Sequence, residues 1–317
     1  MSARAILAVL LLAVAVNAQQ VRHGEAIVIG TPSPGFCACM PMTAYGEVFD
    51  AALGFQRTLW QRPSGSQPAA LAFGRNGELY AAEYTGSGFQ LVRYDAAGNV
   101  IGSFGRSFRD HPPAIAFDTR GNLVVAQQAS GLGPPVEHAF IIFDAAGTGI
   151  GEIDLPNVDS ILDFDIAADG CTAFAGTFTG IGSFDLCSAA PQFVPLPFAS
   201  PGAYHSVRVL PDGNLLVSKA EPAWGLGTVS VFDREGRLVR MFGDTGPLLH
   251  ITLDPEGTSF LAAAENRIGR YSAADGTPLS AFVWMPHGSI DIPALTIRGE
   301  WRATTSQPPP RHRAAGR

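Results

Sequence analysis

One phrase returns throughout the sequence, and this repeat constrains the fold more than any other feature. An apolar run, a D-x-x-G turn and a second apolar run occur in "LVRYDAAGNVIGSFG" at 91–105, "FIIFDAAGTGIGEIDL" at 140–155 and "VSVFDREGRLVRMFGD" at 229–244. Looser copies lie at 46–61, 181–198 and 268–284. Apolar alternation on both sides of a glycine-bearing turn is typical of a β-hairpin. The six copies predict an all-β chain.

A second recurring unit lies between these hairpins: an alternating strand, a glycine turn, and a strand of small apolar residues. It occurs at 68–84, 113–128, 161–177, 204–220 and 248–265. The hairpin aspartate recurs every 39 to 49 residues, at the positions of Asp50, Asp95, Asp144, Asp185, Asp233 and Ser272. Four short strands in a unit of this length are typical of one blade of a β-propeller.

Six outer hairpins but five inner units leave one blade incomplete, and the two ends of the chain supply the missing strands. "EAIVIG" at 25–30 and "IPALTIRGEW" at 292–301 each have the pattern of an inner strand. The last strand is expected to complete the first blade and close the ring, which removes exposed sheet edges. We predict one six-bladed β-propeller over 19–301, with four antiparallel strands per blade. Two separate β-sandwiches would not explain the unbroken repeat.

The first residues are typical of a secretory signal peptide. Arg4 precedes the apolar run 5–16, and Val16, Asn17 and Ala18 form a small-x-small ending. We expect cleavage after Ala18, which removes residues 1–18 and leaves no membrane span, with an uncleaved anchor as the alternative. The run is too short to span a bilayer comfortably. The predicted location is therefore secreted or periplasmic.

Composition limits the partners. The formal net charge is −7, and no basic stripe of the kind that nucleic-acid binders carry is present. Residues 302–317, "RATTSQPPPRHRAAGR", cannot bury a core and are expected to form a disordered tail. The expected partner is a small molecule or a protein, not a nucleic acid, and the expected state is a monomer.

The four cysteines are read as disulfide candidates because the chain is expected to be exported. Cys171 and Cys187 flank a hairpin that folds back near Thr179, and antiparallel pairing about that point places them opposite one another. We predict a disulfide between them. For Cys37 and Cys39, a strained disulfide ring, thiolate metal binding and two free thiols all remain open.

The segments "PAALAFGRNGELYAAE" and "PAIAFDTRGNLVVAQ", each followed by an x-Y/F-D-x-x-G hairpin, resemble the NHL repeat. The resemblance covers residues 65–284 and is weak in the first blade. It implies the superfamily of six-bladed propellers that includes gluconolactonase-like lactonases, streptogramin lyase-like proteins, peptidyl-hydroxyglycine lyases and non-enzymatic binding modules. Because one fold serves all of these, function has to be inferred from a site.

Two sets of polar residues recur at equivalent positions near strand ends. The first set follows the second strand of each unit and is the predicted ligand-binding ring: Glu83, Gln127, Thr177, Lys219 and Glu265. The alternative is a channel lining whose groups satisfy each other and ordered water. The second set lies at the start of the first strand: His111, Asp163, His205 and His250, with His287 before the closing strand.

Histidines that arrive one per blade suit a metal ion, and the lyase branch of the NHL group is similar in binding zinc through such histidines. His205 lies four residues before Val209 but His250 only three before Leu253, so their side chains are expected on opposite faces. A loop histidine and a satisfied core histidine are the alternatives. The catalytic candidates are His205 and His250. The metal candidates are Glu83, Asp163, His205, His250 and Glu265.

A gluconolactonase-like site would need a Glu, an Asn and an Asp around Ca²⁺ or Mg²⁺. Glu83, Glu265, Asn266 and Asp163 have suitable side chains, but no stretch matches that family residue by residue, and no common catalytic or nucleotide-binding motif is present. The cofactor expectation is none, or a divalent cation, Ca²⁺ or Zn²⁺. The first hypothesis is a binding module, and the second is a metal-dependent lactonase or lyase.

Overall fold

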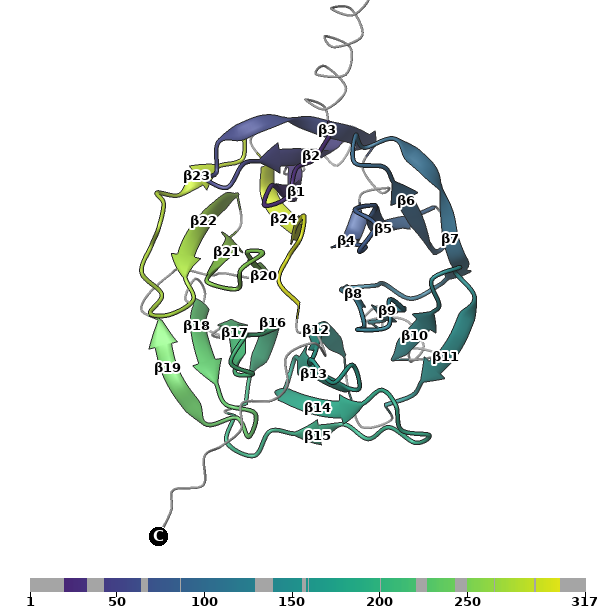
Figure 1. The fold of residues 1–317 in the computed structure, drawn as a ribbon, viewed down its shortest axis with the longest axis vertical. Helices are drawn as coiled ribbons and strands as arrows, with labels where there is room; N and C mark the ends of the chain where they lie inside the picture. The colour runs from purple at the N-terminus through teal and green to yellow at the C-terminus, as the bar shows by residue number, and fades with distance from the viewer. Residues whose placement is uncertain are drawn as a thin grey trace, which may run out of the picture.

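The computed structural model of the protein describes residues 20–32, 43–63, 68–85, 87–128, 139–155, 158, 160–199, 201–220, 227–242, 250–264, 266–287 and 289–302. Regular structure in these residues is entirely β, arranged as six four-stranded sheets around a ring (Figure 1). This confirms the predicted six-bladed β-propeller. The described residues contain no helix of the length and hydropathy that crossing a membrane requires. The predicted signal peptide, Cys37, Cys39, Glu265 and residues 303–317 lie outside the described part.

Each blade runs from the ring centre outward in four strands. Blades 1 to 6 have as innermost strands β24 (Ser289–Ile297), β4 (Pro68–Phe73), β8 (Ile115–Phe117), β12 (Ile161–Ile166), β16 (Ala203–Val209) and β20 (His250–Leu253). The second strands are β1 (Ala26–Pro32), β5 (Leu79–Tyr84), β9 (Leu123–Ala126), β13 (Thr172–Thr177), β17 (Leu215–Ala220) and β21 (Ser259–Ala264).

The two outer layers continue in the same blade order. The third strands are β2 (Thr43–Phe49), β6 (Phe89–Tyr94), β10 (Phe140–Phe143), β14 (Ile181–Asp185), β18 (Gly227–Phe232) and β22 (Arg267–Ser272). The outermost strands are β3 (Phe55–Pro63), β7 (Val100–Phe108), β11 (Gly149–Ile153), β15 (Val194–Pro195), β19 (Leu238–Phe242) and β23 (Val283–Trp284). We call the face of the ring where the innermost strands end the C face, and the face where they begin the N face.

Blade 1 is built from both ends of the chain, as predicted. β24 pairs with β1 in antiparallel register, with Ala26 opposite Ile297 and Val28 opposite Leu295. Figure 1 shows yellow β24 beside purple β1 on the inner side of blade 1. All four of these side chains are buried. The closing strand therefore joins the first and last parts of the repeat through both hydrogen bonds and apolar packing.

The recurring aspartate of the outer hairpin is explained by its hydrogen bonds. Asp95 Oδ1 accepts from the backbone N–H groups of Ala97 and Asn99, both at 2.9 Å. Gly98 has φ of +85°, a left-handed conformation that favours glycine. An aspartate that binds backbone two and four residues ahead fixes a tight turn without needing other contacts. The repeated phrase is thus a turn signal, and it belongs to the scaffold.

The core lies between neighbouring blades. Phe140 of β10 and Phe164 of β12 meet edge to face at a ring-centroid distance of 5.0 Å, and both are almost fully buried. The same cluster holds small residues such as Ala116 of β8 and Ala173 of β13. Together the large rings and the small side chains fill the space between the sheets.

The disulfide between Cys171 and Cys187 is present, with a Cα–Cα distance of 5.2 Å. The two residues flank the hairpin of β13 and β14, whose end pair is Thr172 and Asp185. Antiparallel pairing brings the cysteines side by side, which is the geometry that the sequence predicts.

Candidate functional site

The chain crosses the centre of the C face after β24 (Figure 1). Gly299, with φ of +81°, lets the chain turn away from blade 1 at the end of the strand. Trp301 then packs against the core between blades 5 and 6, and its backbone N–H donates to the carbonyl of Asp254 at 3.1 Å. This path holds Glu300 and Arg302 above the innermost strands.

A buried cluster of charges lies beneath this segment. We call it the central ion network, and its members are Asp163, Asp165, Arg208, Glu300 and Arg302. Arg208 Nη1 lies 2.6 Å from Asp163 Oδ2, and Arg208 Nε lies 3.1 Å from Glu300 Oε1. Arg302 Nη2 lies 3.1 Å from Glu300 Oε2, and Arg302 Nη1 lies 3.7 Å from Asp165 Oδ1. Each carboxylate therefore faces an arginine.

Burial and ion pairing shift the pKa values of the groups in this network in opposite directions. Burial acts to lower the pKa of Arg208, but the charges of Asp163 and Glu300 outweigh it and the net pKa is raised. Burial acts to raise the pKa of Glu300, yet Arg302 and Arg208 bring it below its usual value. For Asp165 burial dominates, and its pKa is raised despite Arg302. Asp165 is therefore the carboxyl of the network most ready to take a proton.

Asp163 is held by protein donors on both oxygens. Its Oδ2 accepts from Ser206 Oγ at 2.6 Å and from the backbone N–H of Val207 at 3.1 Å, in addition to Arg208. Its Oδ1 accepts from the backbone N–H of Phe164 at 2.9 Å. These bonds tie the innermost strands of blades 4 and 5 together. The arrangement suits a structural carboxylate more than a metal ligand.

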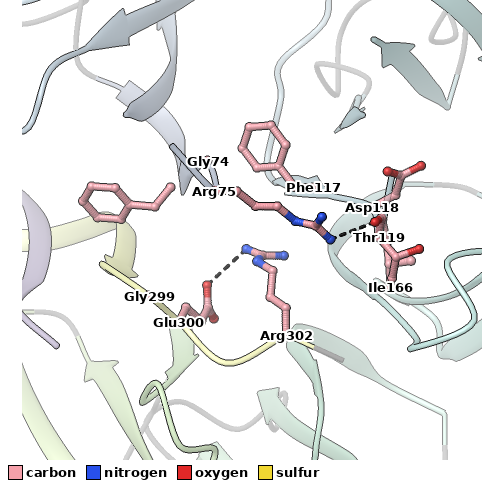
Figure 2. Close-up of a pocket in the computed structure, with 10 residues that line it drawn as sticks. Gly74, Arg75, Phe117, Asp118, Thr119, Ile166, Gly299, Glu300 and Arg302 are labelled. Atoms are coloured by element: carbon pink, nitrogen blue, oxygen red, sulfur yellow. Dashed lines mark hydrogen bonds and ion pairs between the residues drawn. The ribbon is translucent and has the colours of Figure 1, made fainter. Parts of the chain in front are cut away.

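A cavity of about 220 Å³ opens at the same place, and we call it the exit pocket. Its lining combines aromatic, aliphatic and charged side chains: Phe73, Arg75, Phe117, Asp118, Thr119, Ile166, Glu300 and Arg302, with Gly74 and Gly299. Figure 2 shows the guanidinium groups of Arg75 and Arg302 directed into the pocket near the Phe117 ring. Arg75 Nη2 donates to the carbonyl of Thr119 at 2.7 Å.

Glu83, predicted for the ligand-binding ring, lies against blade 1. It accepts a hydrogen bond from the hydroxyl of Tyr94, and Arg62 Nε lies 3.9 Å from its Oε1. Trp60 stacks on Tyr94 with ring centroids 5.0 Å apart. Burial raises the pKa of Glu83, while the bond from Tyr94 opposes the shift. Glu83 is therefore part of a polar cluster between blades.

The other predicted ring residues have separate surroundings. Gln127 is buried and lines a second cavity of about 340 Å³ between blades 2 and 3, together with Arg106 and Arg109. Thr177 Oγ1 accepts from the backbone N–H of Gly180 at 3.0 Å, inside the turn after β13. Lys219 Nζ lies 5.8 Å from the ring centroid of Tyr204. In the part of the chain that the structure describes, Gln127, Thr177 and Lys219 do not line a common cavity.

The predicted histidines are likewise spread over different blades. Burial lowers the pKa of both His111 and His205. His111 packs edge to face on Phe89 with centroids 5.5 Å apart, and His250 begins β20 opposite Ala263. His287 stacks on Tyr45 at 4.1 Å and contacts buried Glu47.

Among the described residues, one group of three side chains has the proximity that a metal site needs: Cys171, Asp185 and Cys187. The two cysteines are joined in a disulfide, so they offer no thiolates. The metal candidates Glu83, Asp163, His205 and His250 form no such group in the described part of the chain, and Glu265 lies outside it. The described residues therefore do not fit a divalent cation at the predicted positions.

The main residues of the C-face site were not singled out from the sequence. Arg75 sits in an ordinary glycine turn, and Glu300 and Arg302 follow the last strand. One signal was available: "LDFDI" at 162–166 has two aspartates where the equivalent stretches "AALAF" at 69–73 and "PAIAF" at 113–117 have alanines. Charges in an innermost strand require buried partners, and these are Arg208 on the innermost strand of the next blade and Arg302, which is more than 130 residues away in sequence.

A scan against protein-family models finds no match for the sequence, and a search of curated proteins finds none either. Solved structures do match the fold. A gluconolactonase from Xanthomonas campestris is 14% identical with a TM-score of 0.55, over 78% of this chain and 85% of that one. A chain of a nidogen/laminin complex is 11% identical with a TM-score of 0.60, over 87% and 98%. The virginiamycin B lyase from Staphylococcus aureus is 13% identical with a TM-score of 0.51, over 70% and 71%.

These likenesses confirm the predicted fold class: the chain has a β-propeller fold like that of these structures, built of six blades. At such identities they establish the fold and leave activity to the residues of the site.

Proposed function

We propose that the chain is an exported six-bladed propeller that binds a small organic ligand in the exit pocket and catalyses no reaction on it. One observation carries the proposal: two guanidinium groups and aromatic side chains converge on one cavity at the mouth of the ring (Figure 2). Convergent polar groups in an otherwise apolar cavity are the usual character of a ligand site.

The residues beneath the pocket support binding over catalysis. Asp163 and Glu300 are held by Arg208 and by backbone donors, so neither is placed to exchange protons with a ligand. A general base needs a pKa near the working pH and reach to its substrate. The buried network is better suited to hold Arg302 rigidly at the floor of the pocket.

The alternative function is a metal-dependent lactonase or lyase, which the fold likeness to a gluconolactonase and a lyase favours. Such an enzyme polarises a carbonyl oxygen with a bound cation. The described candidates His205, His250, Glu83 and Asp163 form no group that fits a cation. We therefore derive no catalytic step for this chain.

The test uses the mature chain, residues 19–317, in a thermal-shift screen with a mixed panel of neutral, cationic and anionic small molecules. A ligand at 100 times its Kd should add about 2.7 kcal/mol to the free energy of unfolding. Hits are then assayed for turnover, next to lactones, with and without EDTA. Binding without turnover supports the proposal. Lactone hydrolysis abolished by EDTA would replace it with the enzyme, and an absence of any hit would leave a protein-binding role.

A further inference from the structure

We infer that the exit pocket selects an aromatic monocarboxylate, a single ring that carries one negative charge. This inference rests on the proposed function, because it names the ligand class of the same site. It places the ligand on the C face, over the central ion network, with the carboxylate between Arg75 and Arg302.

The first support is the position of the two guanidinium groups. Arg75 is exposed and donates to the Thr119 carbonyl, and among the described residues no carboxylate pairs with it. Glu300 and Asp165 form ion pairs with Arg302 and hold its guanidinium group in place. Figure 2 shows both guanidinium groups directed into the cavity. Planar guanidinium donors match a carboxylate with paired hydrogen bonds.

The charge count limits the ligand to about one negative charge. The pocket and its floor hold three arginines against three carboxylates: Arg75, Arg208 and Arg302 against Asp163, Asp165 and Glu300. Asp118 also lines the pocket, but Arg120 Nη2 lies 3.0 Å from it. Arg208 and Arg302 pair with these carboxylates, whereas Arg75 donates to the Thr119 carbonyl and has no carboxylate partner among the described residues. One ligand carboxylate would therefore pair with Arg75, a dianion would bring a second negative charge without such a partner, and a cation would meet two arginines.

The apolar part of the lining and the size of the cavity define the rest of the ligand. Phe73, Phe117 and Ile166 supply a wall that an aromatic ring can pack against. A volume of about 220 Å³ is below the roughly 300–1,000 Å³ of sites for drug-sized ligands. A single ring with a short acid group fits this space, whereas an oligosaccharide or peptide does not.

The experiment is isothermal titration of the mature chain with benzoate, and with benzamide and phenyl phosphate as the neutral and doubly charged analogues. We expect benzoate to bind at least tenfold more tightly than either analogue. Arg75→Gln should weaken benzoate binding roughly ten- to hundredfold, since a charge-assisted hydrogen bond is lost. Arg106→Gln, a change in the cavity between blades 2 and 3, is the matched control and should leave benzoate binding unchanged. Arg302→Lys keeps the charge but loses the planar fork, and should weaken binding as well.

Four results would overturn the inference. Benzamide that binds as well as benzoate would show a ligand pocket without carboxylate selection, and the proposed function would survive. Tighter binding of phenyl phosphate would reassign the site to phosphates. Benzoate binding that Arg106→Gln abolishes and Arg75→Gln does not would place the ligand between blades 2 and 3. No binding of any of the three compounds would refute the ligand class, while the mixed panel decides the proposed function separately.

Discussion

Arg208 Nη1 lies 2.6 Å from Asp163 Oδ2, and this ion pair joins the innermost strands of blades 4 and 5 at the centre of the propeller. Arg208 also reaches Glu300, so that one arginine pairs with two carboxylates from distant parts of the chain. The side chains are mostly buried, at 16% exposure for Arg208 and 9% for Asp163. A pair of this kind is costly to break because the remaining charge is left in the interior.

Replacing Arg208 should therefore destabilise the fold strongly. Arg208→Met keeps the volume but leaves Asp163 and Glu300 without their shared partner, and we expect a loss of about 3–5 kcal/mol in the free energy of unfolding. Urea denaturation measures the loss. The control is Arg237→Met, because the Arg237–Asp233 pair is largely exposed and should contribute little to stability. Equal, small losses in both variants would contradict a structural role for the central ion network.

The disulfide should stabilise the hairpin of β13 and β14. The cysteines are 16 residues apart, and closing a loop of that size lowers the entropy of the unfolded chain by an amount worth about 3 kcal/mol. Cys171→Ser/Cys187→Ser should lose about that much stability, and reduction of the wild type should have the same effect. Denaturation with and without a dithiol reductant checks this. A reductant effect that persists in the double variant would point to another disulfide.

The raised pKa of Asp165 predicts the direction in which the stability of the protein changes with pH. Its pKa in the folded protein is raised above its ordinary value, chiefly by burial. Its contribution to stability is therefore complete below about pH 4 and is lost as the pH rises through the folded pKa. The free energy of unfolding of the wild type, minus that of Asp165→Asn, should fall over this window.

Asp233 is the control, because its effect on stability should change with pH in the opposite direction. Desolvation acts to raise its pKa, but the backbone and side-chain hydrogen bonds from Arg237 and its neighbours together outweigh this effect and lower the pKa. The wild type minus Asp233→Asn difference should rise with pH, since a lowered pKa adds stability above the unfolded value. Denaturation at a series of pH values measures both differences. Two curves of the same sign would contradict the assignment of Asp165 as the buried, proton-accepting member.

Thr296 in the closing strand offers a stabilising change. Its hydroxyl is buried, and no partner is found for it among the described residues. Thr296→Val removes an unsatisfied polar atom at nearly constant volume, so stability should stay equal or rise by about 1 kcal/mol. Thr258→Val is the matched change at a bonded hydroxyl, which donates to Asp254 Oδ2 at 3.1 Å, and it should lower stability by about 1 kcal/mol. A large loss for Thr296→Val would mean that the hydroxyl has a partner.

The fold could be predicted from sequence because its signals are local and repeated. Each turn of the Asp95 type and each alternating strand is determined by a few neighbouring residues. The six copies of this pattern all support the same fold prediction. The disulfide followed from the register of a single hairpin. These features need no knowledge of contacts between distant parts of the chain.

The C-face site could not be read in the same way. Glu300 meets Arg208 and the backbone of Leu253 only after β24 has closed the ring, so its partners depend on tertiary structure. The predicted ring residues share a position in the repeat, yet a side chain such as Glu83 bonds Tyr94 on the next strand of its own blade and lies 3.9 Å from Arg62 of blade 1. Residues at equivalent positions of the repeat have equivalent backbone conformations, but their long side chains can point in different directions.

The central claim, a ligand-binding propeller in place of a metal-dependent enzyme, is tested most directly by the metal content of the mature chain. Elemental analysis is made on protein purified without chelator, beside the His205→Ala/His250→Ala double variant. We predict no stoichiometric zinc or calcium in either protein. About one equivalent in the wild type that is lost in the variant would contradict the claim and make the metal-dependent lactonase or lyase the leading function.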